Sequence, residues 1–156
     1  MSYLIIKNFN QGDPPVAEPD LLPLLQKNVS ERRLIYTNDF SRVGISDIVW
    51  FTFDTPVDDV DEVDTKIIFL TLERIIPFLK NDSMVVFSSQ LPVGTSKKIV
   101  AHISQKRPNF AFAVAYVPEN LQLGKAVKSF FEPGRIVIGA EKEEVFLIIE
   151  NIFGGL

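Results

Sequence analysis

The chain alternates between short apolar runs and segments whose apolar residues recur every three or four positions. The apolar runs are rich in Val, Ile and Phe, and the clearest cover residues 48–53, 84–87 and 110–116. Runs of this length that carry almost no charge are typical of strands covered on both faces, as in a parallel sheet. The three-to-four spacing between the runs predicts connecting helices. The pattern therefore predicts an α/β fold.

Helices are expected between and after these strands. One follows Glu18–Pro19, where Pro23 is tolerated because it lies in the first turn. Another runs from about Thr65 to Lys80, begins with Asp64 as its cap, and is expected to kink or end early at Pro77. The remaining expected elements are helices after Thr95, over Ala126–Phe131 and over Glu143–Phe153, and short strands over Leu34–Thr37 and Arg135–Ile138.

The 156 residues contain no internal repeat, low-complexity tract or linker, so a single domain over residues 1–156 is expected. The order of strands and helices predicts a doubly wound, mainly parallel sheet with helices on both faces. Ligands bind such sheets beyond the carboxyl ends of the strands. The candidate site is therefore formed by the residues that follow the three apolar runs, namely Thr55–Pro56, Ser88–Gln90 and Pro118–Asn120.

Composition and charge exclude several classes of function. Asp and Glu number 20 and Lys and Arg 16, so the net charge of −4 argues against nucleic acid or an anionic membrane as partner. The longest apolar stretch, Phe110–Val117, is far shorter than the roughly 20 residues that cross a bilayer. No signal-peptide pattern is found in the first thirty residues, so a cytoplasmic location is expected. The absence of cysteine excludes disulfides, thiolate metal sites and a cysteine nucleophile within this chain.

Taken singly, the candidate residues have ordinary alternatives. Glu119, after a strand, is suited to acid/base chemistry, but on the bare sequence a helix cap or a solvated loop is favoured. Thr55 is suited to a phosphate contact, but Thr-Pro is also a common strand stop. The acidic run Asp58–Asp64 lacks the glycine and terminal glutamate of a calcium loop, so a solvated connection is favoured and no metal site is predicted. His102, the only histidine, falls on a polar helix side, where a surface role is favoured.

Taken together, the strand ends and the segments around them resemble the amino-terminal domain of the nucleotide-sugar dehydrogenases, the UDP-glucose and GDP-mannose dehydrogenase family. The resemblance runs from roughly Leu4 to Gly139 and includes a proline-glutamate-x-leucine motif at Pro118–Leu121. The other similar segments are Phe9–Gly12 with Glu18–Leu21, Asp47–Pro56, Ser89–Thr95, Gly124–Ala126 and Pro133–Gly139.

The resemblance implies a function and a role for each site residue. The family oxidises the primary C6 alcohol of a nucleotide sugar to a carboxylate in two hydride transfers to NAD. By resemblance, Glu119 is the general acid/base that serves hydrolysis of the thioester intermediate, and Asn120 and Leu121 line the sugar-nucleotide pocket. Thr55 and Gln90 correspond to cofactor-binding positions. The residues do not specify which UDP- or GDP-sugar is the substrate.

The sequence also departs from the family pattern. The first strand, the glycine-rich phosphate turn and the ribose-binding acidic residue should precede Leu4 and are not found, and the cysteine nucleophile is absent. Gln90 stands where the family has threonine, and the carboxylate of Asp54 would repel a pyrophosphate. An incomplete Rossmann-like domain is therefore expected, inactive alone and unsuited to ordinary NAD binding. The alternative is a noncatalytic module that binds a sugar nucleotide or a protein.

The missing first strand has a structural consequence. In the usual order 3-2-1-4-5-6, the run at 48–53 is the fourth strand and loses its neighbour. Its apolar, nearly uncharged edge is of the kind that recruits another strand. We therefore expect either a homo-oligomer through this edge or a substitute strand formed by Tyr3–Phe9, although the resemblance makes that segment helical.

Overall fold

The chain forms two compact units, which a computed structural model describes over residues 3–14, 16–57, 63–119 and 121–154. The first, here called the helical unit, consists of residues 1–39 and 120–135. The second, here called the sheet unit, consists of residues 40–119 and 136–156.

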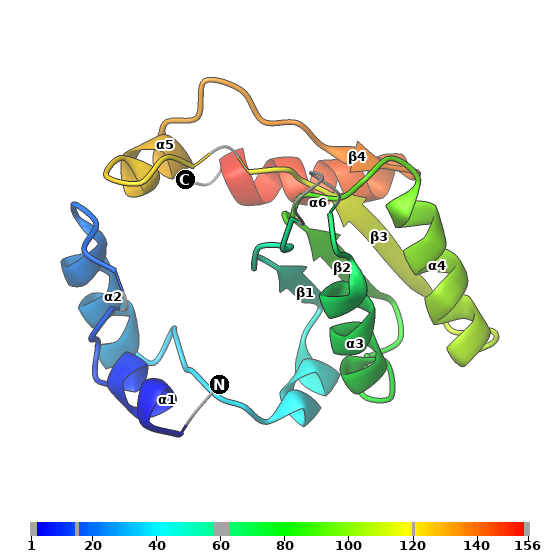
Figure 1. Ribbon diagram of the computed structural model, residues 1–156, viewed down its shortest axis with the longest axis horizontal. Coiled ribbons are helices and arrows are strands. Elements are labelled where there is room, and N and C mark those ends of the chain that lie inside the picture. The colour runs from blue at the N-terminus through cyan, green and yellow to red at the C-terminus, as the bar shows by residue number, and fades with distance from the viewer. Residues whose placement is uncertain (1–2, 15, 58–62, 120, 155–156) are drawn as a thin grey trace. The chain divides into compact units, whose positions relative to one another are not determined.

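The sheet unit is built on four strands in the order β1-β2-β3-β4 (Figure 1). Strands β1 (Ile48–Phe51), β2 (Ser83–Phe87) and β3 (Phe112–Tyr116) are parallel, and β4 (Gly139–Ala140) pairs antiparallel with the end of β3. The predicted mainly parallel sheet is confirmed. The strand expected over residues 135–138 is wrong in position, because the only pairing in this part of the chain is that of Gly139 and Ala140 with β3.

Helices cover both faces of the sheet. These are α3 (Lys66–Ile75), α4 (Thr95–Lys106) and α6 (Glu143–Gly154), with a 3-10 turn at Phe40–Ile45. Side chains alternate along a strand, so Val85 and Phe87 pack with α3 and α4, whereas Met84 and Val86 pack with α6 on the opposite face. All five residues of β2 are buried, as expected for a central parallel strand.

The start of α3 agrees with the sequence, and its early end is the one expected at Pro77. The side chain of Asp64 accepts a hydrogen bond from the backbone N–H of Lys66, the first helical residue, at 2.8 Å, as predicted for a capping side chain, although Thr65 occupies the N-cap position. The helix ends at Ile75 and not near Lys80. Pro77 explains the early end, since it has no N–H to donate and its ring crowds the preceding turn.

The helical unit contains α1 (Tyr3–Asn10), α2 (Leu21–Ser30) and α5 (Ala126–Phe131). The substitute strand expected at Tyr3–Phe9 is therefore wrong. The backbone hydrogen bonds of this segment are used within and just after the helix, where Gln11 N–H donates to the carbonyl of Lys7. A segment whose backbone is bonded along a helix cannot at the same time form the hydrogen-bond ladder of a strand.

The segment expected to be a strand at 34–37 is not one. Instead, the amide side chain of Asn10 donates to the carbonyl of Tyr36 at 2.8 Å and accepts from its N–H at 2.8 Å. One side chain thus replaces the neighbouring strand. The turn after α1 needs Gly12, which has φ 77° and whose added Cβ would meet Cγ of Gln26 at 2.9 Å.

Among the described residues, β1 lies at an edge of the sheet with β2 as its one neighbour. The carbonyls of Asp47 and Phe51 accept hydrogen bonds from Met84 and Ser88 of the β2 segment. Because alternate residues of a strand point their backbone groups to opposite sides, those of Ile48 and Trp50 point away from β2. The predicted homo-oligomer through this edge stays a prediction. Within the described ranges, none of the helices has the length and apolar character that a membrane span requires.

The packing of α6 can be tested with two neighbouring isoleucines. Ile149 is fully buried, whereas Ile148 is 44% exposed. We expect Ile149→Ala to lower the free energy of unfolding by about 2–5 kcal/mol, because it leaves a cavity against the sheet. Ile148→Ala should cost about 1 kcal/mol or less. Urea denaturation measures both, and equal losses would contradict the orientation of α6.

Candidate functional site

The candidate site lies at the end of the sheet formed by the carboxyl termini of β1, β2 and β3. This end is distinct from the open side of the edge strand β1. Side chains at the carboxyl end join the three segments beyond the last ladder bonds. The indole Nε1–H of Trp50 donates to Oγ of Ser88 at 2.8 Å, and that hydroxyl donates to the carbonyl of Val117 at 2.7 Å. One serine thus connects the segments of β1 and β3 across β2.

Two further hydroxyls continue this connection outward. Oγ of Ser89 donates to the carbonyl of Phe53 at 2.5 Å, and Oγ1 of Thr55 donates to the carbonyl of Gln90 at 2.7 Å. Both donors are buried, with Thr55 6% exposed. Buried hydroxyls that are paired in this way hold a loop in one conformation, because releasing them would leave polar groups unsatisfied. The loops after β1 and β2 are therefore fixed to each other.

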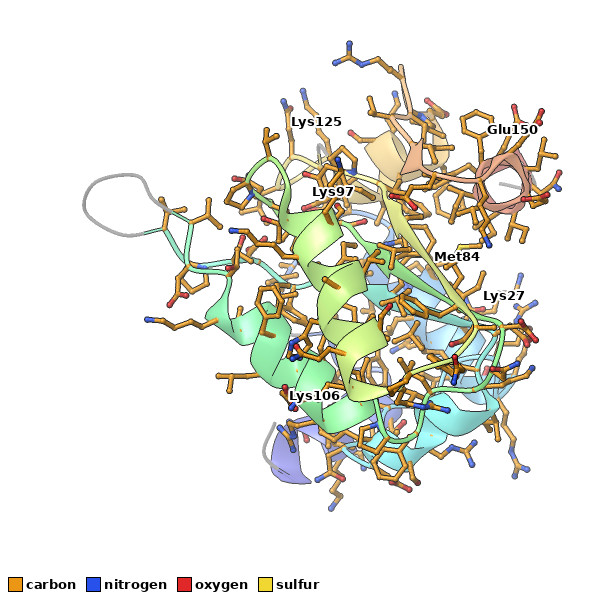
Figure 2. All side chains as sticks on the ribbon, turned by 90° about the vertical axis from the view of Figure 1, so that its right-hand side faces the viewer. Lys27, Met84, Lys97, Lys106, Lys125 and Glu150 are labelled. Atoms are coloured by element: carbon orange, nitrogen blue, oxygen red, sulfur yellow. The ribbon has the colours of Figure 1, made fainter. Side chains whose placement is uncertain are left out.

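The loop after β2 leads into the amino terminus of α4, which carries Lys97 and Lys98 and no acidic residue in its first turn. Figure 2 labels Lys97 and Lys106 toward the two ends of this helix. The N–H groups at a helix start have a partial positive charge, and the two lysines add to it. This end of α4 is thus suited to an anion. On the loop after β1, the exposed Asp54 carries the opposite charge.

The structure places the predicted site residues in different settings. Thr55 and Gln90 are brought together by the hydrogen bond described above. Glu119 is exposed and lies two residues after Val117, whose backbone is held by β2 and Ser88. Asn120 lies outside the described residues. Leu121 is 43% exposed and belongs to the helical unit.

Thr55 and its neighbours do not fit the pyrophosphate of NAD as they stand. A phosphate oxygen needs a hydrogen-bond donor, and a hydroxyl has one proton to give. Thr55 already donates that proton to Gln90 and is buried, and Asp54 beside it would repel a phosphate. The predicted cofactor role of Thr55 stays a prediction that requires its hydroxyl to release Gln90.

His102 is half-buried on α4, and its ring contacts that of Phe69 edge-on at 5.4 Å between centroids. Its Nε2 lies 2.8 Å from Oε1 of Glu73, a close ion-pair distance without hydrogen-bond alignment. The same carboxylate oxygen lies 3.0 Å from Nζ of Lys106. Hydrogen bonding to Lys106 is the main cause that lowers the pKa of Glu73, and His102 adds to the shift. His102 thus joins α4 to α3.

Most of the acidic run has no structural description, because residues 58–62 lie outside the described ranges. Asp64, at its end, caps α3. In the part of the chain that is described, no group of three or more His, Asp and Glu side chains is arranged to hold a metal ion.

Sequence reasoning placed Ser88 and Ser89 at the site but missed the hydrogen bonds by which they hold it together. Ser88 and Ser89 follow a buried strand, which marks them as site residues, but nothing local reveals that their hydroxyls donate to carbonyls 29 and 36 residues away. The pattern marks Trp50 only as part of an apolar run, although an indole N–H needs a hydrogen-bond partner when it is buried. That need is the one signal from which its role was predictable.

Comparison with known proteins identifies the family. Residues 2–156 match the family model described as "UDP-glucose/GDP-mannose dehydrogenase family, NAD binding domain". The chain belongs to this family. It is 32% identical over 155 residues to the UDP-glucose 6-dehydrogenase of Rickettsia typhi, covering 97% of this chain and 35% of that protein. With the UDP-glucose 6-dehydrogenase TuaD of Bacillus subtilis it shares 33% identity over 150 residues, covering 94% and 32%. The chain therefore spans about a third of the length of these relatives.

Solved structures give the same fold. A ternary complex of GDP-mannose dehydrogenase from Pseudomonas aeruginosa matches with a TM-score of 0.91 and 28% identity, over 99% of this chain and 37% of that one. A UDP-glucose dehydrogenase from Pyrobaculum islandicum matches with a TM-score of 0.89 over 99% and 37%, and its 24% identity supports the fold alone. The expected Rossmann-like α/β fold is thereby confirmed.

The role of Thr55 in fixing the loops can be tested by Thr55→Val, which keeps the shape and removes the hydroxyl. We expect a loss of about 1 kcal/mol in the free energy of unfolding, measured by urea denaturation, since water can reach the freed carbonyl of the exposed Gln90. Thr71→Val is the matched control, because its hydroxyl only duplicates a bond to the helical carbonyl of Ile67. A control as costly as Thr55→Val would argue against the loop contact.

The cluster around Glu73 predicts a pH dependence of stability. The pKa of Glu73 is lower in the folded state than its ordinary value, so its contribution is present above about pH 4.3 and is lost as the pH falls through the lowered value. Glu73→Gln should therefore reduce the melting temperature slightly at pH 7, and less in 1 M NaCl. The difference from the unaltered chain should vanish in acid. Melting curves at several pH values test this, and a gap unchanged by acid would refute the assignment.

Proposed function

We propose that this chain is the nucleotide-binding part of an NAD-dependent dehydrogenase that oxidises the primary alcohol of a UDP- or GDP-sugar to a carboxylate. Family membership supports the class of reaction. The relatives named UDP-glucose 6-dehydrogenase and the ternary complex of a GDP-mannose dehydrogenase support the class of substrate. Because the chain spans about a third of those proteins, the activity of the whole is proposed and not assigned.

The observation that carries the proposal is the fixed edge at which β1, β2 and β3 end. Side-chain hydrogen bonds from Ser88, Ser89 and Thr55 hold three loops at the place where ligands bind α/β sheets. A preorganised edge binds a ligand with a smaller loss of conformational entropy than a mobile one. This argument favours a binding function over a purely structural one.

Glu119 is the proposed acid/base residue. Its carboxylate is exposed, and the backbone two residues earlier is held at Val117. A carboxylate so placed can take a proton from water as the water attacks a thioester, and can return it when the thiol leaves. Asn120 and Leu121 follow directly and are proposed to contact the sugar nucleotide. The thiol for such a thioester must come from outside this sequence, which contains no cysteine.

For the chain by itself we therefore infer sugar-nucleotide binding without turnover and weak binding of NAD. The engaged hydroxyl of Thr55 and the carboxylate of Asp54 support the second part of this inference. A protein-interaction module is the second candidate. It is favoured by β1, because the backbone groups of Ile48 and Trp50 point away from β2 at a sheet edge.

Thermal shift with UDP-glucose, GDP-mannose and NAD separates these proposals. A sugar nucleotide at 100 times its dissociation constant should stabilise the chain by about 2.7 kcal/mol, which raises the melting temperature by several degrees. NAD should give a much smaller shift. Glu119→Gln is the control, because it removes acid/base capacity and should leave binding of the neutral sugar nearly unchanged.

Each result decides between the candidates. A shift with NAD comparable to that with a sugar nucleotide would contradict the interpretation of Thr55 and Asp54. No shift with any ligand would contradict nucleotide binding and leave the interaction module, which sedimentation at several concentrations then tests.

A further inference from the structure

Glu18 joins two parts of the helical unit that are more than one hundred residues apart in sequence. Its Oε2 accepts a hydrogen bond from the N–H of Gly124 at 2.7 Å, and its Oε1 accepts one from the N–H of Ala126 at 2.7 Å. Both oxygens of one carboxylate are thus used on backbone donors. We call Glu18, Gly124 and Ala126 the carboxylate clamp. Hydrogen bonds to a charged acceptor are roughly twice as strong as neutral ones.

The clamp holds a turn that requires a left-handed backbone conformation at Gly124. The N–H of Lys125 donates to the carbonyl of Gln122 at 3.0 Å, which closes a turn with Gly124 in its third position. Gly124 has φ 82°, where a side chain would be strained even though the space around it is open. Ala126 is the first residue of α5, so the carboxylate also satisfies an N–H that the helix leaves free. The conformation of residues 122–126 is therefore held by several independent constraints: the turn hydrogen bond, the glycine and the two bonds to Glu18.

This turn follows directly on the residues proposed to bind the sugar nucleotide. Leu121 precedes Gly124 by three positions and Asn120 by four. Leu121 is itself partly exposed. A partly exposed residue is ordered to a large extent by its neighbours in the chain, and the clamp holds the backbone at Gly124, three positions after Leu121. The clamp thus gives a structural role to Glu18, the first residue of the Glu18–Leu21 segment.

We propose that Glu18 is a positioning residue for sugar-nucleotide binding, acting through the turn at 122–125 on Leu121. This inference rests on the proposed function, because it uses the assignment of Leu121 to the substrate. Glu18 does not itself need to touch the ligand. Its effect is to hold Leu121 in its binding conformation, so the conformational entropy of ordering this residue is lost on folding and not on binding.

The test uses Glu18→Ala and Glu18→Gln in the full chain, with Glu132→Ala as matched control. Glu132 is an exposed carboxylate of the same unit, just after α5, with a loose contact of 3.9 Å to Lys128 and no place in the clamp. Amide hydrogen exchange, followed by NMR, measures whether the N–H groups of Gly124 and Ala126 are hydrogen-bonded. Exchange at Val85 and Val86, in the buried strand β2, shows whether the fold survives.

In the unaltered chain, the amides of Gly124 and Ala126 should be protected from exchange, and UDP-glucose or GDP-mannose should bind in calorimetry. Glu18→Ala should remove both protections and weaken sugar-nucleotide binding by roughly tenfold, the effect expected for losing two charge-assisted hydrogen bonds in part compensated by water. Glu18→Gln keeps one carbonyl acceptor and should give an intermediate result. Glu132→Ala should change neither reading. Protection at Val85 and Val86 should persist in all variants.

Three results would overturn the inference, and they differ from one another. Rapid exchange at Gly124 and Ala126 in the unaltered chain would show that the clamp does not form. Lost protection in Glu18→Ala with unchanged affinity would make Glu18 a structural residue only. No binding of either sugar nucleotide by the unaltered chain, with the clamp amides protected, would refute the proposed function and with it the positioning role.

Discussion

The parallel hydrogen bonding of β1, β2 and β3 is the constraint on which the rest of the sheet unit depends. Parallel neighbours cannot be joined by a tight turn, so each connection must cross a face of the sheet, and α3 and α4 make these crossings. Both faces of β2 are then buried. The same pairing brings three carboxyl ends to one edge. The place of the candidate site is thus a consequence of the ladder and does not depend on any one site residue.

The hydroxyls beyond the strand ends fix the loops there, but they are then no longer free to donate to a ligand. Ser88, Ser89 and Thr55 continue the cross-strand bonding after the ladder ends, which fixes the loops that a ligand would meet. A hydroxyl that donates inward cannot also donate to a ligand. The residue types typical of a phosphate site are therefore present here, but the donor of Thr55 serves the protein. Residue type alone could not distinguish these two uses, whereas hydrogen-bond direction does.

The sequence was informative where structure is local or covered on both faces. The runs at 48–53 and 84–87 predicted strands because two-sided burial leaves a continuous apolar stretch, and Asp64 predicted its cap because a cap is a local contact. Thr55 and Gln90 were expected at one edge and lie there. The failures have a common cause. Asn10 bonds Tyr36, 26 residues away, and no periodic pattern records such a contact, so the segment at 34–37 was predicted to be a strand. The position of Glu119 after β3 was predictable from the sequence. Its chemical role was not, because that role depends on a ligand that the sequence does not identify.

The hydrogen bonds available at the open side of β1 are too few to hold an oligomer together by themselves. Its outward backbone groups are those of Ile48 and Trp50, since Asp47, just before the strand, and Phe51, at its end, bond to the β2 segment and the direction alternates between them. Each added hydrogen bond contributes a net of about 1 kcal/mol, whereas association costs an estimated 4–15 kcal/mol in translational and rotational freedom. A strand this short cannot hold two copies together by its edge alone. Any oligomer formed here must therefore also bury apolar side chains, whose removal from water supplies the free energy that the backbone bonds of so short a strand lack.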